Sequence, residues 1–288
     1  MSLDALSYDF VRQALLAGLL ASVLCGVVGT LVVVKRLVFL GAGISHASFG
    51  GLGVCYFLGL EPLLGAGAVA VAAALVLGRA GAATGHGAAA RSNDALIGIL
   101  WAVGMAVGVV FVHLTPGYAP NLMTYLFGNI LTVGARDVAA AAALVAVVVA
   151  AFGLFYKETV AVAFDEEFAA VQGVPVRLAT TAILLVTALS VVFLIQLVGI
   201  ILVMALLTIP PVVALMLFRR FLAVVAASTA LGAVMTVGGF TLAYATDLPS
   251  GPAMVLLGTA VLLAVAGGRR LVRGHTRSRL PPHHRPEM

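Results

Sequence analysis

The chain has 288 residues, of which 62% are hydrophobic and only 9% carry a formal charge. Soluble domains carry charges on about a quarter of their residues, so this composition excludes an ordinary soluble enzyme or binding module. Both cysteines, Cys25 and Cys55, fall in apolar runs, and a pair so placed does not support a disulfide framework. We therefore expect a protein that lies in a membrane.

Long runs without a charged residue predict membrane-crossing helices, since a span needs about 20 apolar residues. The run 95–135 is interrupted by TPGYAPN (115–121), whose prolines and glycine end a helix, and the run 178–218 is predicted to turn near QLVG (196–199). The continuous apolar character favours helices over barrel strands. We predict an all-α polytopic protein of eight or nine transmembrane helices. In chain order the runs are 13–34, 37–60, 62–78, 95–135, 138–156, 178–218, 221–246 and 248–268.

Basic residues are unevenly divided between the two sides of the predicted membrane. If nine segments cross in alternation, only Arg12 and Arg136 share the side of the N-terminus, and the other fourteen of the 16 lysines and arginines lie opposite. This asymmetry assigns the larger group to the cytoplasm. The N-terminus is then outside and the C-terminus inside. Because the net charge of +5 arises mainly from this anchoring, no nucleic-acid partner is predicted.

Between the fourth and fifth spans, YLFGNIL (125–131) is too short to cross alone and predicts a re-entrant or interfacial piece at the outer face. The C-terminal residues 269–288 form a basic tail with three histidines. We predict a transmembrane domain over 1–268 and a disordered cytoplasmic tail, with metal collection by the tail as the alternative. The three histidines are His275, His283 and His284.

The most polar internal segment, 157–177, lies on the predicted cytoplasmic side and contains FDEEFAAVQG. This stretch predicts a short helix, because acidic side chains in a first turn complement the helix dipole and a glycine followed by a proline ends a helix. The acidic residues are Asp165, Glu166 and Glu167, and the C-terminal signals are Gly173 and Pro175.

One face of this predicted helix is apolar. Phe164, Phe168 and Val171 are spaced i, i+4 and i+7, which places their side chains along one stripe. Such a face fits a groove in a partner or the membrane surface. A solvated loop with a single helical turn is the alternative.

Signatures of catalysis are missing from the sequence. There is no G-x-x-x-x-G-K-[ST], and neither of the only lysines, Lys35 and Lys157, follows a glycine, so the chain cannot bind ATP through a P-loop. Zinc-protease, zinc-ribbon and nucleophile-elbow patterns are also absent. We expect a protein that is not itself an enzyme.

A single histidine, His46, lies inside the uncharged run 37–60, in FLGAGISHASFGG. An ionisable group within a span is a functional hypothesis by default, and a neutral imidazole is a good ligand for zinc, iron and manganese. The alternative is a hydrogen bond to a neighbouring helix. Asp94 and Asp247 are the next candidate metal ligands, although each also fits a helix cap.

Several segments, in this order, resemble the permease subunits of bacterial ABC importers for zinc, manganese or iron. The resemblance implies the fold of the large (type II) ABC importers in the bacterial inner membrane, with two permease copies on two ATPase subunits that bind ATP. It also implies an extracytoplasmic metal-binding protein and identifies 164–175 as the helix that couples the permease to the ATPase. The segments are VVVKRLVFLGAGISHASFGGLG (32–53), NDALIGILWAVGMAVGVVF (93–111), YLFGNIL (125–131), FDEEFAAVQGVPV (164–176), LVGIILVMALLTIPPVVALML (197–217) and DLPSGPAMVLLG (247–258).

The chain departs from the family pattern at one position beside His46. Many members carry an aspartate four residues before this histidine, where the chain has Ala42. The resemblance therefore implies a metal-binding role for the histidine alone and not for a histidine–aspartate pair.

A permease for a metal chelate or a cobalamin-like cofactor is one alternative function. An ATPase-independent secondary transporter is another, but it predicts buried acidic groups that the spans hardly contain.

Overall fold

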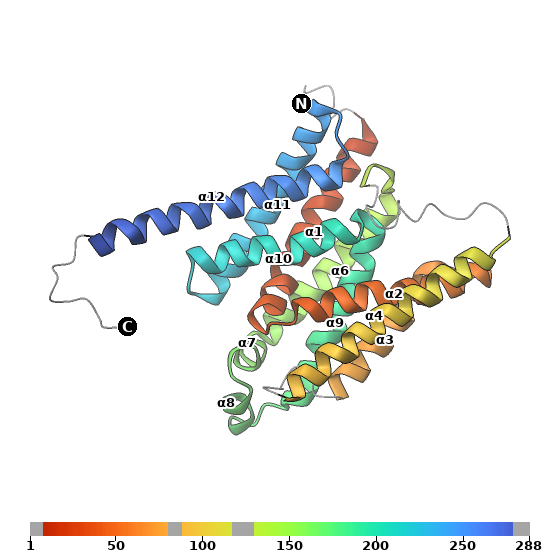
Figure 1. The fold of residues 1–288 in the computed structure, drawn as a ribbon, viewed down its shortest axis with the longest axis horizontal. Helices are drawn as coiled ribbons and strands as arrows, with labels where there is room; N and C mark the ends of the chain where they lie inside the picture. Colours follow the sequence, from red (N-terminus) through yellow and green to blue (C-terminus); the bar gives the residue numbers. More distant parts are fainter. Residues whose placement is uncertain (1–7, 80–87, 117–129, 279–288) are drawn as a thin grey trace.

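The computed structural model describes residues 8–79, 88–116 and 130–278 (Figure 1). In these residues the chain forms helices joined by short links, without a strand, and nine helices are long and apolar enough to cross a membrane. The prediction of an all-α polytopic protein is therefore confirmed. The helices are α1 (Asp9–Val34), α2 (Val38–Phe57), α3 (Pro62–Arg79), α4 (Ala88–Leu114), the 3-10 turn η2 (Ile130–Thr132), α6 (Ala135–Leu154), α7 (Tyr156–Phe164), α8 (Glu166–Val171), α9 (Val176–Val198), α10 (Ile200–Leu217), α11 (Phe221–Thr246) and α12 (Ser250–Ser278).

The spans form two groups on either side of α1 (Figure 1). Helices α2, α3 and α4 lie side by side, with α9 packed against α3, while α10, α11 and α12 pack on one another at the other side. Helix α1 contacts α10 and α11 as well as α6 and α9, so it joins the two groups. Its buried residues are spaced along the helix up to Ser22 and continuous from Leu24 to Val32.

Glycines allow close backbone approach around α2. A Cβ atom added at Gly51 would collide with the carbonyl group of Gly65 in α3, and one added at Gly50 would meet the backbone of Gly104 in α4. Helices in a membrane associate through such close packing, because burial from lipid supplies little driving force. The glycine-rich stretch around His46 is thus the part of α2 that holds three helices together.

Both helix interruptions predicted inside the long apolar runs are present. Helix α4 ends at Leu114, directly before TPGYAPN, and Gly199 separates α9 from α10 with a φ of 84°. Only the last two residues of YLFGNIL, which lie in η2, are among the described ones. The prediction of a re-entrant piece therefore falls largely outside the described residues.

The polar segment 157–177 forms two helices where the sequence predicted one. Helix α7 ends at Phe164, Asp165 is extended, and α8 covers only Glu166–Val171, so the predicted range 164–175 is too long at both ends. At the C-terminal end of α8 the reason is Gly173, whose φ of 82° ends the helical path.

Near the C-terminus of the chain, α12 continues to Ser278. The remainder of the predicted tail lies outside the described residues.

Candidate functional site

Helix α8 begins at a side-chain cap. The Asp165 carboxylate accepts a hydrogen bond of 2.9 Å from the backbone N–H of Phe168, which satisfies one of the free donors at the helix start. Glu166 and Glu167 follow in the first turn, where negative charge is favoured. The acidic run therefore stabilises a helix that is otherwise too short to persist alone.

Three apolar side chains of α7 and α8 are exposed, and we refer to them together as the docking surface. Phe164, Phe168 and Val171 are 62%, 56% and 88% exposed. Phe164 belongs to the end of α7 and rests edge-on against Phe221, with ring centroids 5.8 Å apart. The prediction that all three share one helix is wrong, because the extended Asp165 separates the two helices.

The opposite side of α8 faces the protein. Ala169 is fully buried and clusters with Val162 of α7 and Ile183 of α9. The inward-facing part of this short helix is thus apolar and small, so the helix lies close to the ends of the spans (Figure 1). An outward apolar surface on a segment fixed from behind is the arrangement that a partner groove recognises.

Glu166, which was predicted as an acidic residue in the first turn of this helix, makes contacts within the chain. Its Oε1 atom lies 2.6 Å from Nζ of Lys35 and 3.5 Å from Oγ1 of Thr180 in α9. The Glu166 side chain is only 19% exposed. The Glu166 carboxylate is thus paired within the chain with Lys35, the residue that follows α1.

His46 lies in α2 and stacks on Trp101 of α4, with ring centroids 4.2 Å apart and nearly parallel planes. Its Nδ1 atom is buried and makes no hydrogen bond within the described structure. Ala42, one turn earlier, is partly exposed like His46, so the two positions share a stripe that is not closed by packing. The nearby hydroxyls of Ser45 and Ser48 donate to carbonyls of their own helix.

Of the two candidate aspartates, the structure describes the side chain of Asp247. Asp247 is exposed in the link between α11 and α12, where it ends α11 with a left-handed φ of 56°. Asp94 lies within α4, after the helix has begun at Ala88, and its side chain is outside the described residues. Among the described residues no group of three or more His, Cys, Asp or Glu side chains could hold a metal ion.

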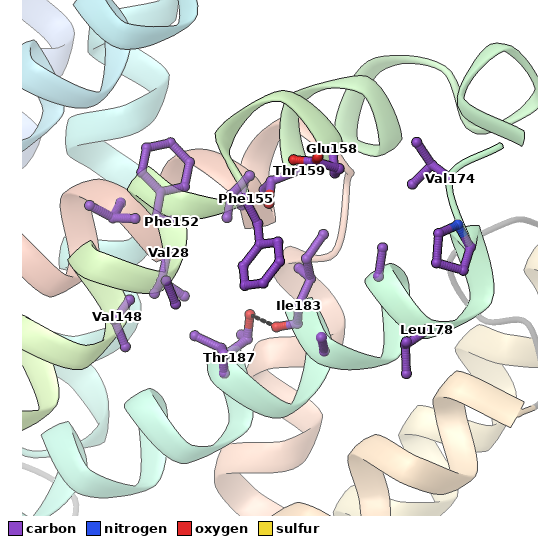
Figure 2. A pocket seen from close by; sticks show the side chains of 17 residues that line it. Val28, Val148, Phe152, Phe155, Glu158, Thr159, Val174, Leu178, Ile183 and Thr187 are labelled. Carbon is purple, nitrogen blue, oxygen red and sulfur yellow. Dashed lines mark hydrogen bonds between the residues drawn. The ribbon is translucent and has the colours of Figure 1, made fainter. Parts of the chain in front are cut away.

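A pocket of about 370 Å³ lies between α1, α6, α7 and α9. Figure 2 shows its lining side chains, among which Phe152, Phe155 and Ile183 are apolar. Glu158 is the only carboxylate among the described residues that line it, and the Thr187 hydroxyl already donates to the Ile183 carbonyl at 2.8 Å. A divalent metal ion needs several oxygen, nitrogen or sulfur ligands, so this pocket is unsuited to hold one.

Comparison with known families covers almost the whole chain. The model of the ABC 3 transport family matches residues 7–267. The chain belongs to the ABC 3 transport family. This membership confirms the resemblance to ABC importer permeases and the expected place in a membrane.

Relatives of this ABC 3 chain agree in length with it. It is 35% identical over 267 residues to an uncharacterized membrane protein of Synechocystis sp., with 93% of each chain covered. It is 30% identical over 256 residues to the manganese transport system membrane protein MntC of Listeria monocytogenes, with 89% of each covered. A chain of PsaBC from Streptococcus pneumoniae, solved in complex with Fab, has a TM-score of 0.78 and 25% identity, and the match covers 90% of this chain and 91% of that one.

Two features of this ABC 3 chain escaped the sequence analysis. The pairing of Lys35 with Glu166 could have been suspected, because Lys35 is one of two lysines and both residues fall on the predicted cytoplasmic side. The apolar pocket carries no such signal. Its lining comes from separate segments whose residues are ordinary for a membrane span.

Proposed function

We propose that this chain is the permease subunit of an ABC importer that moves a divalent transition-metal ion, zinc, manganese or iron, across the bacterial inner membrane. The observation that carries this proposal is the docking surface of Phe164, Phe168 and Val171 beside a capped helix between two spans. Family membership supports the ABC importer. The relative named as a manganese transporter supports the metal.

The docking surface would receive a separate ATPase, which binds and hydrolyses ATP. Burying an exposed Phe or Val side chain contributes about 1.5–3 kcal/mol, so these three side chains supply a large part of a contact. Phe168→Asp removes apolar area and places a charge in the interface. We expect loss of the ATPase in co-purification from membranes, with the permease still eluting as a folded species.

A matched control places the same charge elsewhere. Leu248 is an exposed apolar side chain in the link between α11 and α12, on the predicted outer side. Leu248→Asp should leave the ATPase bound. Undiminished association of the Phe168→Asp variant would contradict the docking proposal. Glu166→Arg does not test it, since this charge reversal places a second cation against the enclosed Lys35.

For the ion path we propose a transient contact with His46. Its Nδ1 has no partner among the described residues, and the side chain lies on the partly open stripe of α2. His46→Phe keeps a ring against Trp101 and removes both ring nitrogens. In proteoliposomes of the complete complex, supplied separately with zinc, manganese and iron, this variant should take up less metal. Trp101→Phe is the control, and uptake equal to wild type in His46→Phe would exclude the contact.

The proposal includes two further partners, a second copy of this permease and an extracytoplasmic metal-binding protein. The chain itself is proposed to have no catalytic activity, because ATP hydrolysis belongs to the ATPase. The mass of the purified complex should correspond to two permeases and two ATPases. The permease purified alone should hydrolyse no ATP.

A further inference from the structure

One ion pair joins the end of α1 to the start of α8. Lys35 directly follows α1, and its Nζ donates to Glu166 Oε1 at 2.6 Å and to the carbonyl oxygen of Val162 at 3.0 Å. The Lys35 side chain is only 3% exposed. Both partners are therefore largely withdrawn from solvent.

Such an enclosed pair differs from an ordinary surface salt bridge. Exposed pairs contribute little and are easily exchanged for water, whereas an enclosed charge that loses its partner is left uncompensated. The two side chains must therefore remain together while either segment moves. The contact behaves as a connection between segments more than as a source of net stability.

The pair lies where several elements meet. After Lys35 the chain turns through Arg36, whose φ of 58° is left-handed, and α2 then begins at Val38 and carries His46 two turns later. Glu166 is the first residue of α8, and its Oε1 also lies 3.5 Å from Oγ1 of Thr180 in α9. One carboxylate thus contacts the junction between α1 and α2 on one side and α9 on the other.

We propose that Lys35 is a positioning residue that transmits movement of α8 to the junction from which α2 begins. This inference rests on the proposed function, in which an ATPase binds and moves the docking surface. When α8 moves, Glu166 draws Lys35 with it. The start of α2, the helix that carries His46, then moves with the ATPase. Without the pair, the ATPase still binds and hydrolyses ATP, but hydrolysis no longer drives transport.

The test measures metal transported per ATP hydrolysed by the reconstituted permease–ATPase complex. Lys35→Met and Glu166→Gln should each lower this ratio about 10-fold, within the usual range of coupling between sites, while the ATPase stays bound. The double variant should lose no more than either single one, because both changes remove the same contact. The exposed charges Lys157 and Glu167 offer matched controls, and Lys157→Met and Glu167→Gln should keep the wild-type ratio.

Each other outcome counts against the inference. An unchanged ratio in an assembled complex overturns it and leaves the docking proposal intact. Loss of ATPase association in the Lys35 and Glu166 variants also overturns it, since the pair would then merely support the docking surface. If Lys35→Met does not fold, the ratio measured with Glu166→Gln still tests the inference, because this substitution keeps the shape of the side chain. Failure of the docking proposal itself is seen separately, as retained ATPase in Phe168→Asp.

Discussion

Helices α2 and α8 are held in place by opposite means. In α2, glycines bring its backbone against α3 and α4, and the serine hydroxyls bond within the helix. In α8, a side-chain cap and an enclosed ion pair hold the helix, and the apolar side chains of the docking surface point outward. Within lipid, fit between helices decides the arrangement because burial of apolar surface is not specific. At the aqueous end, polar contacts can be specific and apolar side chains remain available for a partner.

The largest effect, on stability, is expected where α2 packs closely against α3. Gly51→Ala places a methyl group against the Gly65 carbonyl, and the two helices must separate. We expect a loss of about 1–3 kcal/mol, the usual cost of overpacking, seen as a lower thermal unfolding temperature in detergent. Gly41→Ala, in the same helix, meets nothing within 4 Å and should leave the temperature unchanged. Equal behaviour of the two variants would show that close approach does not hold α2.

An intermediate effect, on metal affinity, is expected at the partly exposed position of Ala42 in α2. Ala42→Asp returns a carboxylate one turn before His46 at a partly exposed position. Zinc or manganese affinity of the purified complex, measured by equilibrium dialysis with elemental analysis, should rise by about 10-fold, as for a carboxylate that supports a histidine ligand.

The control for this change is Ala47→Asp, which places the same carboxylate at a buried position of the same helix. It should destabilise the protein without tighter binding, because an unpaired charge is costly in the interior. Unchanged metal affinity in a folded Ala42→Asp variant would contradict a contact between His46 and the transported metal.

The smallest effect is expected at the start of α8. Asp165→Ala removes the carboxylate that accepts from the Phe168 N–H, and losing such a cap costs about 1 kcal/mol. Hydrogen exchange of the α8 amides should accelerate while exchange in α2 is unaffected. Glu167→Ala removes a neighbouring charge without removing a cap and should change exchange less. Equal acceleration in both variants would assign the effect to charge alone.

Local rules predicted a good part of this structure. The breaks at TPGYAPN and at Gly199 follow from residues that end helices wherever they occur. The helix after Asp165 was likewise predicted from its acidic first turn and Gly173. Its length was predicted wrongly, because the extended conformation of Asp165, which serves as the cap of α8, divides the segment into two helices.

The candidate site was less accessible from sequence. Glu166 was predicted only as one of three acidic residues in a first turn, and helical spacing does not say which of them meets another segment. Lys35 is 131 positions away in the chain, and no periodic pattern relates the two. The same holds for His46 and Trp101, whose stacking depends on how α2 and α4 lie against each other.

By itself, the sequence determined that this is a membrane protein built of apolar helices, with an acidic-capped helix between two spans. These properties depend on composition and on neighbours within a turn or two. Only the tertiary structure decided that Glu166 faces Lys35, that His46 lies against Trp101, and that an apolar pocket lies between α1, α6, α7 and α9. These contacts depend on how distant helices pack, and in lipid that packing is set by shape complementarity along whole helices.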